Sequence, residues 1–457
     1  MKQSLLSMLL LVTLAGCVPP RPPSPQAATI TPSPVWRTDL TGTAQIDIAW
    51  WRQFGDPALS AQVEAAIANN PDIAIAAARV REARAQEALA RAQLFPTLDA
   101  GLSASHSRSV SALGSASETG SVQPVFQSAY EVDLFGRIDS QVEAARAAYL
   151  ASAAARDAAT LSVAAATASG YITLLGLDAR REVVRLTISS RAEALRLARS
   201  RANAGYTSEL ELRQAEAEYE AAAQILPQVD LAISRQENAL SVLTGRAPAA
   251  IRPRAKLSGL QAPPLPGGLP STLLRRRPDI AQAELSLAAS DATLDAARAQ
   301  FLPSLRLTGS AGGLISDALP DPISIWSIGG SILAPLFEGG RLRAGVGTAA
   351  ARRDQAAFAY KRTTLAAFRE VEDALVSVVK LAEQRRSLEA QRAAVAEALR
   401  HATNRYQAGY SPYLEQLDAQ RSLLNTDLSL VQLRTDQLNA VVSLYQALGG
   451  GWGGITH

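Results

Sequence analysis

The chain has 457 residues, of which 47% are hydrophobic and only 5% aromatic, and its 45 basic and 42 acidic residues give a formal net charge of +3. This near balance, without a dense basic run, excludes a nucleic-acid-binding protein. Scarce aromatic residues and abundant alanine favour long, closely packed helices over a bulky globular core.

The N-terminus is typical of an exported lipoprotein. Residues 1–16 contain an apolar run too short to cross a bilayer, which indicates a secretion signal. Residues 14–17 read Leu-Ala-Gly-Cys, the bacterial lipobox, and Cys17 is the only cysteine in the chain. We expect cleavage before Cys17 and attachment of N-acyl and S-diacylglycerol groups, which anchor the mature chain to a membrane. Val18, instead of an aspartate, favours the outer membrane. The alternative is an ordinary secreted protein with a chance cysteine.

The rest of the chain is organised as a tether followed by two similar halves. Residues 71–73 recur as 278–280, and residues 204–207 recur in similar form as 408–411, each about 200 positions later. This period is too long for a solenoid and indicates duplication of a whole structural unit. We expect a lipidated, proline-rich tether at 17–50, a first repeat at 51–245, a linker at 246–272, a second repeat at 273–449 and a tail at 450–457.

Each half contains the pattern of a long helical hairpin. Proline-free stretches at 138–203 and 342–407 predict two helices of about 65 residues, each roughly 97 Å long. Turns containing Gly205 and Gly409 lead into returning helices at 209–244 and 412–448, and Pro227 should kink or break the first of these. The small residues leave no sharp heptad seam, so a plain alanine-rich helical bundle remains an alternative.

Strand patterns precede each hairpin. Apolar residues alternate with small or polar ones in four segments, at 97–105, 122–134, 304–311 and 324–332, and a Ser/Gly-rich loop is expected at 113–120. Four strands cannot close a barrel alone, and an open sheet edge is not tolerated in lipid, so the chain would have to oligomerise. The alternative is a pair of soluble hairpins capping a helical bundle.

Two further segments carry a family resemblance. Residues 405–424 read RYQAGYSPYLEQLDAQRSLL and residues 444–452 read LYQALGGGW. With the lipobox and the duplication, the chain resembles the TolC-like outer membrane efflux proteins, in the lipoprotein branch that serves resistance-nodulation-division pumps. The resemblance implies a homotrimer, mainly α with a small β part. Its 12-stranded β-barrel, four strands per chain, lies in outer membrane lipid and continues as a periplasmic α-helical barrel about 100 Å long.

The resemblance also implies a constriction at the lower tip of the helical barrel. Leu414, Asp418 and Arg421 follow i, i+4 and i+7 spacing, so they share one helix face. In a trimer, the leucines would narrow the pore by dewetting and the aspartates would attract cations, with Arg421 paired beside the carboxylate. The equivalent positions in the first half are Leu210, Gln214 and Ala217, so the charged ring belongs to the second hairpin only. The alternative is an ordinary surface ion pair between Asp418 and Arg421.

Other tip residues have implied roles as well. The resemblance suggests that Arg405 and Tyr406 bond across the tip to the neighbouring hairpin, with Glu211 as the acceptor. Gly205 and Gly409 are expected at positions that need a positive φ, and their place at the tips makes them candidates for docking a periplasmic adaptor, also called a membrane fusion protein. Capping of the helices alone is the alternative for these glycines.

The sequence offers no support for catalysis. The three histidines, at 106, 401 and 457, stand alone without metal-ligand spacing, and no glycine-rich phosphate loop follows a strand. We therefore expect a non-enzymatic exit duct, without cofactor or metal, that passively conducts drugs or small toxic compounds from an inner-membrane pump and its adaptor. The alternatives are a type I secretion duct and a non-conducting structural lipoprotein.

Overall fold

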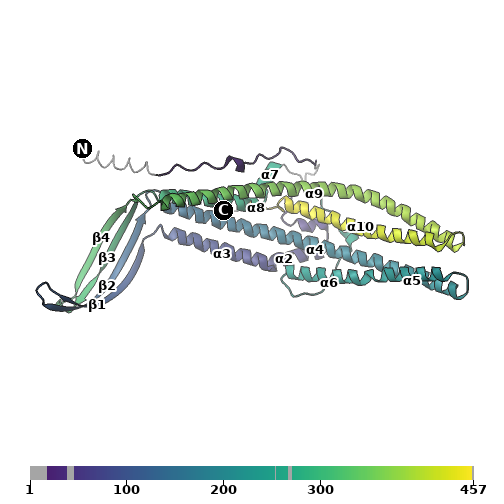
Figure 1. Cartoon of the computed structure of the whole chain (residues 1–457), viewed down its shortest axis with the longest axis horizontal. Helices are drawn as coiled ribbons and strands as arrows, with labels where there is room; N and C mark the ends of the chain where they lie inside the picture. The colour runs from purple at the N-terminus through teal and green to yellow at the C-terminus, as the bar shows by residue number, and fades with distance from the viewer. Residues whose placement is uncertain (1–17, 39–45, 253, 266–269, 455–457) are drawn as a thin grey trace. The chain divides into compact units, whose positions relative to one another are not determined.

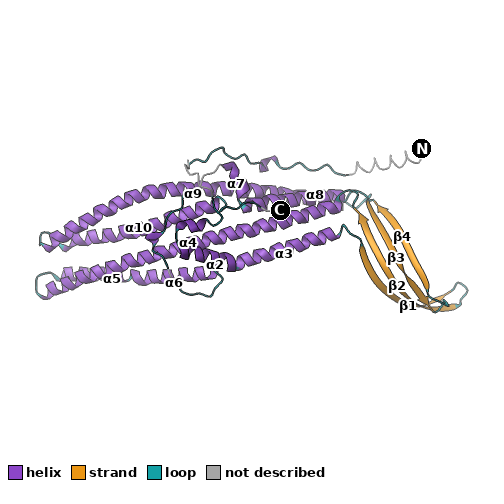
Figure 2. Ribbon diagram, turned by 180° about the vertical axis from the view of Figure 1, so that it is seen from behind, coloured by secondary structure: helices purple, strands orange, loops and turns teal. Residues whose placement is uncertain are grey.

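The computed structural model of the chain describes residues 18–38, 46–252, 254–265 and 270–454. Helices dominate these residues, and their strands form one four-stranded sheet (Figure 1, Figure 2). The expected mainly helical fold with a small β part is confirmed. In chain order the elements are η1 (Gln26–Ala28), η2 (Trp50–Phe54), α2 (Pro57–Asn69), α3 (Pro71–Ala92), β1 (Thr97–Val110), β2 (Ala116–Val132), α4 (Arg137–Asn203), α5 (Glu209–Ala223), α6 (Ile225–Leu243), η3 (Leu257–Gly259), α7 (Pro270–Arg276), α8 (Pro278–Ala299), β3 (Ser304–Ser316), β4 (Ile323–Leu333), α9 (Arg341–Gln407) and α10 (Tyr413–Ala447).

The described residues pack as two compact units, each assembled from separate segments. Unit 1 comprises 18–30, 78–153 and 282–362, and unit 2 comprises the described residues of 31–77, 154–281 and 363–454. Each unit draws on both halves of the sequence, because α3, α4, α8 and α9 continue from one unit into the other. The expected bounds of the two repeats mark duplicated halves of the sequence, and they do not coincide with the two compact units. The repeat bounds stay a prediction.

Unit 1 contains the sheet, whose strands pair in the order β1-β2-β3-β4 with every neighbouring pair antiparallel. All four expected strands are present and each is longer than expected. The expected loop at 113–120 is wrong for residues 116–120, which pair with residues 106–110 of β1. Ladder bonds and cross-strand contacts, such as the 3.6 Å ion pair between Arg108 and Glu118, stabilise an extended segment whose composition is that of a loop. Within the described chain, β1 and β4 remain edges of the sheet.

The helices repeat with equal lengths. Helices α3 and α8 each have 22 residues, and α4 and α9 each have 67. The two long helices, about 100 Å each, begin within one residue of the positions expected from the sequence. Helix α4 also contains a window apolar enough to cross a membrane, but half of that window is buried within the chain. Such burial is what a helix packed among other helices requires.

The two returning helices differ at the expected proline. Helix α10 runs for 35 residues without interruption, whereas the first hairpin returns as α5 and α6, separated at Gln224. Pro227 lacks the amide hydrogen that would bond the carbonyl of Ala223, so the helical ladder cannot continue through this point. The expected break is therefore confirmed.

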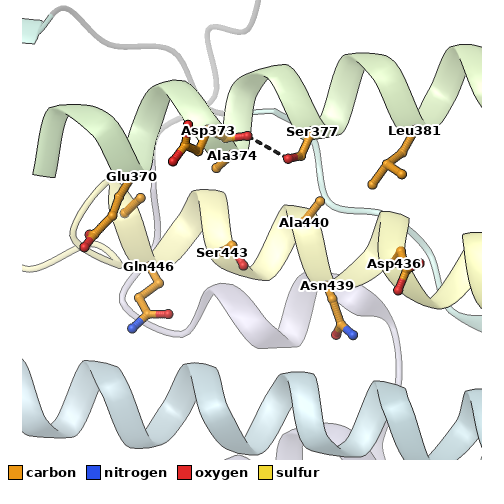
Figure 3. A pocket seen from close by; sticks show the side chains of 11 residues that line it. Glu370, Asp373, Ala374, Ser377, Leu381, Asp436, Asn439, Ala440, Ser443 and Gln446 are labelled. Atoms are coloured by element: carbon orange, nitrogen blue, oxygen red, sulfur yellow. Dashed lines mark hydrogen bonds between the residues drawn. The ribbon is translucent and has the colours of Figure 1, made fainter. Parts of the chain in front are cut away.

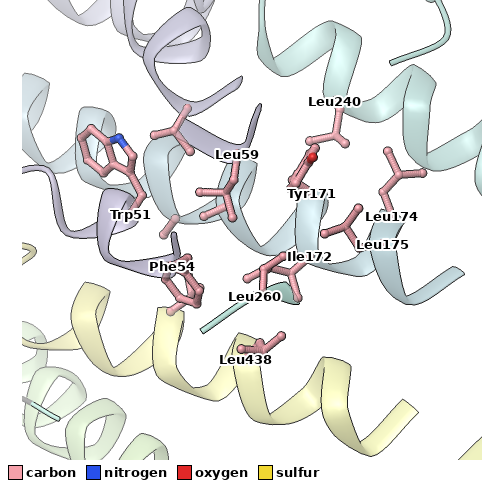
Figure 4. Close-up of a cluster of buried hydrophobic side chains, with 14 of the residues drawn as sticks. Trp51, Phe54, Leu59, Tyr171, Ile172, Leu174, Leu175, Leu240, Leu260 and Leu438 are labelled. Atoms are coloured by element: carbon pink, nitrogen blue, oxygen red, sulfur yellow. The ribbon is translucent and has the colours of Figure 1, made fainter. Parts of the chain in front are cut away.

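The core of unit 2 gathers residues from six separate elements (Figure 4). Trp50 is fully buried and stacks on Tyr445 of α10, with ring centroids 5.5 Å apart. Phe54, Leu59, Tyr171, Ile172, Leu240, Leu260 and Leu438 pack in the same cluster. The residues after α10 close on this region through Gly449, Gly450 and Gly451, all with positive φ. A Cβ at Gly449 would lie 1.9 Å from the Arg276 carbonyl oxygen, so only glycine fits there.

Candidate gate at the hairpin tips

Both hairpins of unit 2 turn through the same backbone geometry. Gly205 has φ 73° and Gly409 has φ 78°, a conformation that only glycine adopts among the described residues. In each turn the amide after the glycine donates to a carbonyl in the last turn of the long helix, over 2.9 Å in both cases. A Cβ at either glycine would meet no atom within 4 Å. Glycine is needed here for its backbone conformation, as the capping prediction required.

A hydrogen bond joins the second hairpin to the first at these turns. The hydroxyl of Tyr406, in the last turn of α9, donates to a carboxylate oxygen of Glu211 in the first turn of α5. Thr207 donates to the other oxygen of the same carboxylate over 2.5 Å. The Tyr406 ring packs against Tyr413, with centroids 5.4 Å apart, and the Arg201 guanidinium lies 5.4 Å from its centroid. The expected contact between Tyr406 and Glu211 is confirmed.

The environment of Tyr406 keeps its proton in place. Burial, reinforced by the hydrogen bond to Glu211, raises the pKa of Tyr406 from 10.0 to about 12. An ionised phenolate beside the Glu211 carboxylate would place two negative charges in contact and would have no proton to donate. At neutral pH the bridge is therefore a phenol donating to a carboxylate.

A second bridge joins the two returning helices, α10 and α5. Arg421 of α10 donates through Nε to Oε1 of Glu218 in α5, over 2.8 Å. Arg191 of α4 approaches the other carboxylate oxygen at 3.0 Å and donates to the backbone carbonyl of Glu218 over 2.7 Å. The side chains of Glu218 and Arg191 are 7% and 6% exposed, whereas that of Arg421 is 53% exposed. Glu218 is thus a buried carboxylate held between an inner and an outer guanidinium.

The two arginines of this second bridge have pKa values shifted in opposite directions. The hydrogen bond to Glu218 raises the pKa of Arg421, and the Asp418 carboxylate adds to that effect. Burial lowers the pKa of Arg191, although Glu218 opposes the shift. Splitting the buried pair would leave a desolvated charge, whereas Arg421 can swing away into water. The outer arginine is the part of the bridge that can open at low cost.

The three residues expected at the constriction lie on one exposed face of α10. Leu414 is 56% exposed, and Asp418 and Arg421 are exposed as well. The expected partner of Arg421 was Asp418, but its ion pair is with Glu218. A buried carboxylate has lost its water and gains more from a guanidinium than an exposed one does, which accounts for this choice.

Arg405 differs from its neighbour Tyr406. Its guanidinium lies 3.5 Å from Glu415 of the same hairpin, and both side chains are well exposed. The expected bond of Arg405 across the tip is therefore not the contact that this residue makes. An exposed pair of this kind adds little to stability.

Glu218 and Arg191 belong to the site but were not predicted from the sequence. Glu218 follows Glu211 at i+7, so both carboxylates lie on the same face of α5, and this spacing could have identified it once Glu211 was chosen. Arg191 lies 27 positions before Glu218, on a different helix. Nothing in the local pattern marks it, because its role depends on the register of α4 against α5.

Among the described residues, carboxylates gather in a groove but form no metal-binding cluster. The described part of the chain contains no group of three His, Cys, Asp or Glu residues able to hold a metal. A groove between α9 and α10 is lined by the carboxylates of Glu370, Asp373 and Asp436 (Figure 3). Arg277 pairs with Glu370 at 2.8 Å, and the lining of the groove contains no histidine or cysteine. The hydroxyl groups of the lining belong to Ser377 and Ser443, and the Ser377 hydroxyl donates to the backbone carbonyl of Asp373 over 2.7 Å instead of to a histidine base.

Comparison with known proteins identifies the family. Residues 63–246 and 269–450 match the family model described as outer membrane efflux protein. The chain belongs to the outer membrane efflux protein family. It is 34% identical to the toluene efflux pump outer membrane protein TtgC of Pseudomonas putida, over 99% of this chain and 96% of that protein. It is 30% identical to the probable outer membrane lipoprotein SilC of Salmonella typhimurium, over 99% of each chain.

A solved structure extends the likeness to the fold. The Campylobacter jejuni CmeC outer membrane channel matches with a TM-score of 0.87 and 26% sequence identity, over 95% of each chain. The resemblance drawn from residues 405–424 and 444–452 is thereby confirmed. As a member of the efflux protein family, the chain is an outer-membrane protein that serves as an efflux exit duct.

Proposed function

We propose that three copies of the chain form the outer-membrane duct of a tripartite efflux system, and that the two bridges between the hairpin tips hold its periplasmic end closed. The observation that carries the gate is that Tyr406 and Arg421 of the second hairpin both bond carboxylates of the first. The bridges lie near the ends of helices about 100 Å long, where a tilt of about 5° would move a tip by about 9 Å. Contacts at the tips therefore resist the largest displacement that a given helix tilt produces.

The open sheet supports the proposed trimer. Strands β1 and β4 are unpaired edges within the described chain, and all 14 residues of β1 are exposed. Because lipid does not tolerate free backbone donors and acceptors, each edge needs a strand from another copy. Pairing β4 of one copy with β1 of the next closes a barrel, and three copies supply its 12 strands.

In this trimer, Leu414 and Asp418 form the narrowest rings of the duct. Both side chains are exposed on α10 and are therefore free to face a common axis. A ring of leucines resists wetting, and a ring of carboxylates attracts cations and repels anions. Arg421, bonded to Glu218, holds this face of the second hairpin against the first.

The proposed system also includes a lipid anchor at Cys17, a periplasmic adaptor and an inner-membrane pump. Cys17 lies outside the described residues, and its lipidation is supported by the lipobox and by the name of the relative SilC, an outer membrane lipoprotein. A periplasmic adaptor docks on the turns at Gly205 and Gly409, beside Tyr206 and Tyr410, which are 85% and 80% exposed. An inner-membrane resistance-nodulation-division pump supplies the energy, and the chain itself catalyses no reaction and needs no cofactor. The cargo consists of drugs or other small toxic compounds.

Single-channel recording in planar bilayers tests the gate. The variant Tyr406→Phe with Arg421→Ala removes the donors of both bridges and should raise resting conductance severalfold. The matched control is Tyr206→Phe with Arg213→Ala, which alters an exposed tyrosine and two ion pairs confined to the first hairpin. Equal conductance of both variants and wild type would refute the gate, and an absence of any channel would refute the duct.

A further inference from the structure

The proline-rich segment after the lipobox is docked along its length in unit 1. Among residues 18–30, the half-buried ones are Val18, Pro19, Pro22, Pro25, Ala28 and Ile30, and the others are exposed. Positions 19, 22, 25 and 28 recur every three residues, which is the period of a polyproline helix and also of the short 3-10 turn η1. A free tether would show no such period, so one face of this segment is in contact with the protein.

Helices α8 and α9 supply the hydrogen-bond donors that this segment needs. Prolines have no amide hydrogen, so the segment offers mainly carbonyl acceptors. Arg298 of α8 donates to the Pro19 carbonyl over 3.4 Å, and Lys361 of α9 donates to the Ala27 carbonyl over 2.5 Å. Between these ends, Arg21 of the segment donates to Asp291 of α8 over 2.9 Å. The contacts are therefore spread over the segment instead of being confined to one point.

Arg353 of α9 holds the middle of the segment. Its Nη2 donates to the carbonyls of Pro22 and Pro23 over 3.2 and 3.0 Å, and its Nη1 donates to the Ser24 hydroxyl over 3.3 Å. Its Nε donates to Asp354 over 2.7 Å, and Asp291 lies 3.8 Å from Nη1. The guanidinium thus donates four hydrogen bonds, three of them to the segment, and Asp291 adds an ion pair at 3.8 Å.

The burial of Arg353 makes those partners necessary. This residue is only 1% exposed, although arginine is rarely buried in proteins. A buried cation without its acceptors carries a large desolvation cost, so the guanidinium is stable in this place only while the segment covers it. Arg353 and the segment therefore require each other.

The spacing of the contacts matches on the two sides. From Pro23 to Ala27, two polyproline steps and two 3-10 steps advance about 10 Å. From Arg353 to Lys361, eight helical residues advance about 12 Å in the same direction. The long side chains of arginine and lysine absorb the difference. The segment runs along α9 without slack, and its upstream end meets Arg298 in the last turn of α8, shortly before β3 begins at Ser304.

We propose that residues 18–30 form a strap clasped by Arg353, which fixes the N-terminal end of the mature chain at the junction of α8 and β3. Arg353 is a positioning residue in this device. The proposal deepens the proposed lipidation and rests on it for its consequence: an acyl anchor two residues upstream of Pro19 can reach at most about 7 Å from that contact. The anchor would then enter the membrane beside the chain's own strands instead of at the end of a loose tether.

The test places a nitroxide label on a cysteine at Gln26, an exposed position in the strap, and measures its mobility by electron paramagnetic resonance in the full-length protein. We expect a restricted label in wild type and at least about a threefold shorter rotational correlation time in Arg353→Ala. Arg352→Ala is the matched control, because Arg352 is the exposed neighbour on the same helix. A mobile label in wild type, or equal mobility in the two variants, would overturn the clasp.

A second variant tests the strap even if Arg353→Ala fails to fold. Arg298→Ala removes the donor to the Pro19 carbonyl, together with the ion pair of Arg298 with Asp295 in the same helix, and leaves Arg353 in place. A label at Pro20 should therefore become mobile while a label at Gln26 stays restricted. Equal mobility of the Pro20 label in this variant and wild type would contradict the fixed upstream end. Fatty-acid labelling of Cys17, followed separately, tests the anchor: loss of lipid with a restricted strap refutes lipidation alone, and lipid with a mobile strap refutes the clasp alone.

Discussion

The two hairpin tips have nearly the same backbone but opposite hydrogen-bonding character. Both turn at a glycine with positive φ and close with matching amide-to-carbonyl bonds. The first tip supplies the acceptors Glu211 and Glu218, and the second supplies the donors Tyr406 and Arg421. At the positions equivalent to those donors, the first hairpin has Ala202 and Ala217.

This difference shows how a duplicated unit acquired a directional contact. Two copies with the same charges would repel each other or would have no preferred partner. With acceptors on one copy and donors on the other, the hairpins pair in one arrangement, and each bridge can be removed without altering the turns. The glycine turns fix the backbone of the tips, and the side-chain bridges hold the two hairpins together. Substitutions in the bridges should therefore weaken the contact between the hairpins without changing the turns.

The largest effect is expected from Glu218→Ala, which removes the acceptor of both Arg421 and Arg191. Because Arg191 would remain buried without its carboxylate, the free energy of unfolding should fall by about 3 kcal/mol. Denaturant unfolding in detergent, followed by circular dichroism, measures this change. The control is Glu216→Ala in the same helix, whose partners Arg213 and Arg199 are both more than half exposed. That variant should lose less than about 1 kcal/mol. Similar losses in both would mean that Glu218 is an ordinary surface carboxylate.

An intermediate effect is expected from pH acting on Tyr406. Its pKa is raised from 10.0 to about 12 in the folded chain, so the neutral phenol stabilises the tip. This contribution is fully present below pH 10 and is lost as the pH rises from 10 to about 12, because a tyrosine freed from this environment, in an opened tip as in the unfolded chain, releases its proton near pH 10. Resting conductance of wild type should therefore rise across this window. Tyr406→Phe should already be raised at neutral pH and should lack the alkaline step, and Tyr206→Phe should behave like wild type. An unchanged alkaline step in Tyr406→Phe would assign it to another group.

The smallest effect on stability, and a specific effect on the pore, is expected from Asp418→Ala. This exposed carboxylate acts on Arg421 only through its charge and bonds no described residue of the first hairpin, so the unfolding free energy should change by less than about 0.5 kcal/mol. Cation preference in single-channel recordings should weaken, and resting conductance should rise, at matched ionic strength. The control is Asp436→Ala, a carboxylate of the same helix that, among the described residues, accepts a hydrogen bond only from Gln432, one turn earlier in α10. Asp427 is avoided because it pairs with Arg392 of α9 at 2.8 Å. Unchanged selectivity in Asp418→Ala would place this residue outside the constriction.

Local patterns predicted much of the fold. The two 67-residue helices, their glycine turns and the break near Pro227 were all predictable, since each depends on neighbouring residues and on the φ that one residue can adopt. The strands were placed correctly but too short. Residues 116–120 have the composition of a loop and become a strand only because residues 106–110 lie opposite to bond them.

The sequence by itself determined the helical hairpins, the duplication, the Tyr406–Glu211 contact through a family pattern, and the family itself. Only the tertiary structure decided that Arg421 bonds Glu218 across 203 positions, that Arg191 backs the same carboxylate, and that Arg353 clasps a segment 330 positions away. The physical reason is register: a guanidinium on one helix meets a carboxylate or a carbonyl on another only when both elements are packed at a particular height. The residue pattern within one segment contains no information on the height at which that segment packs against another.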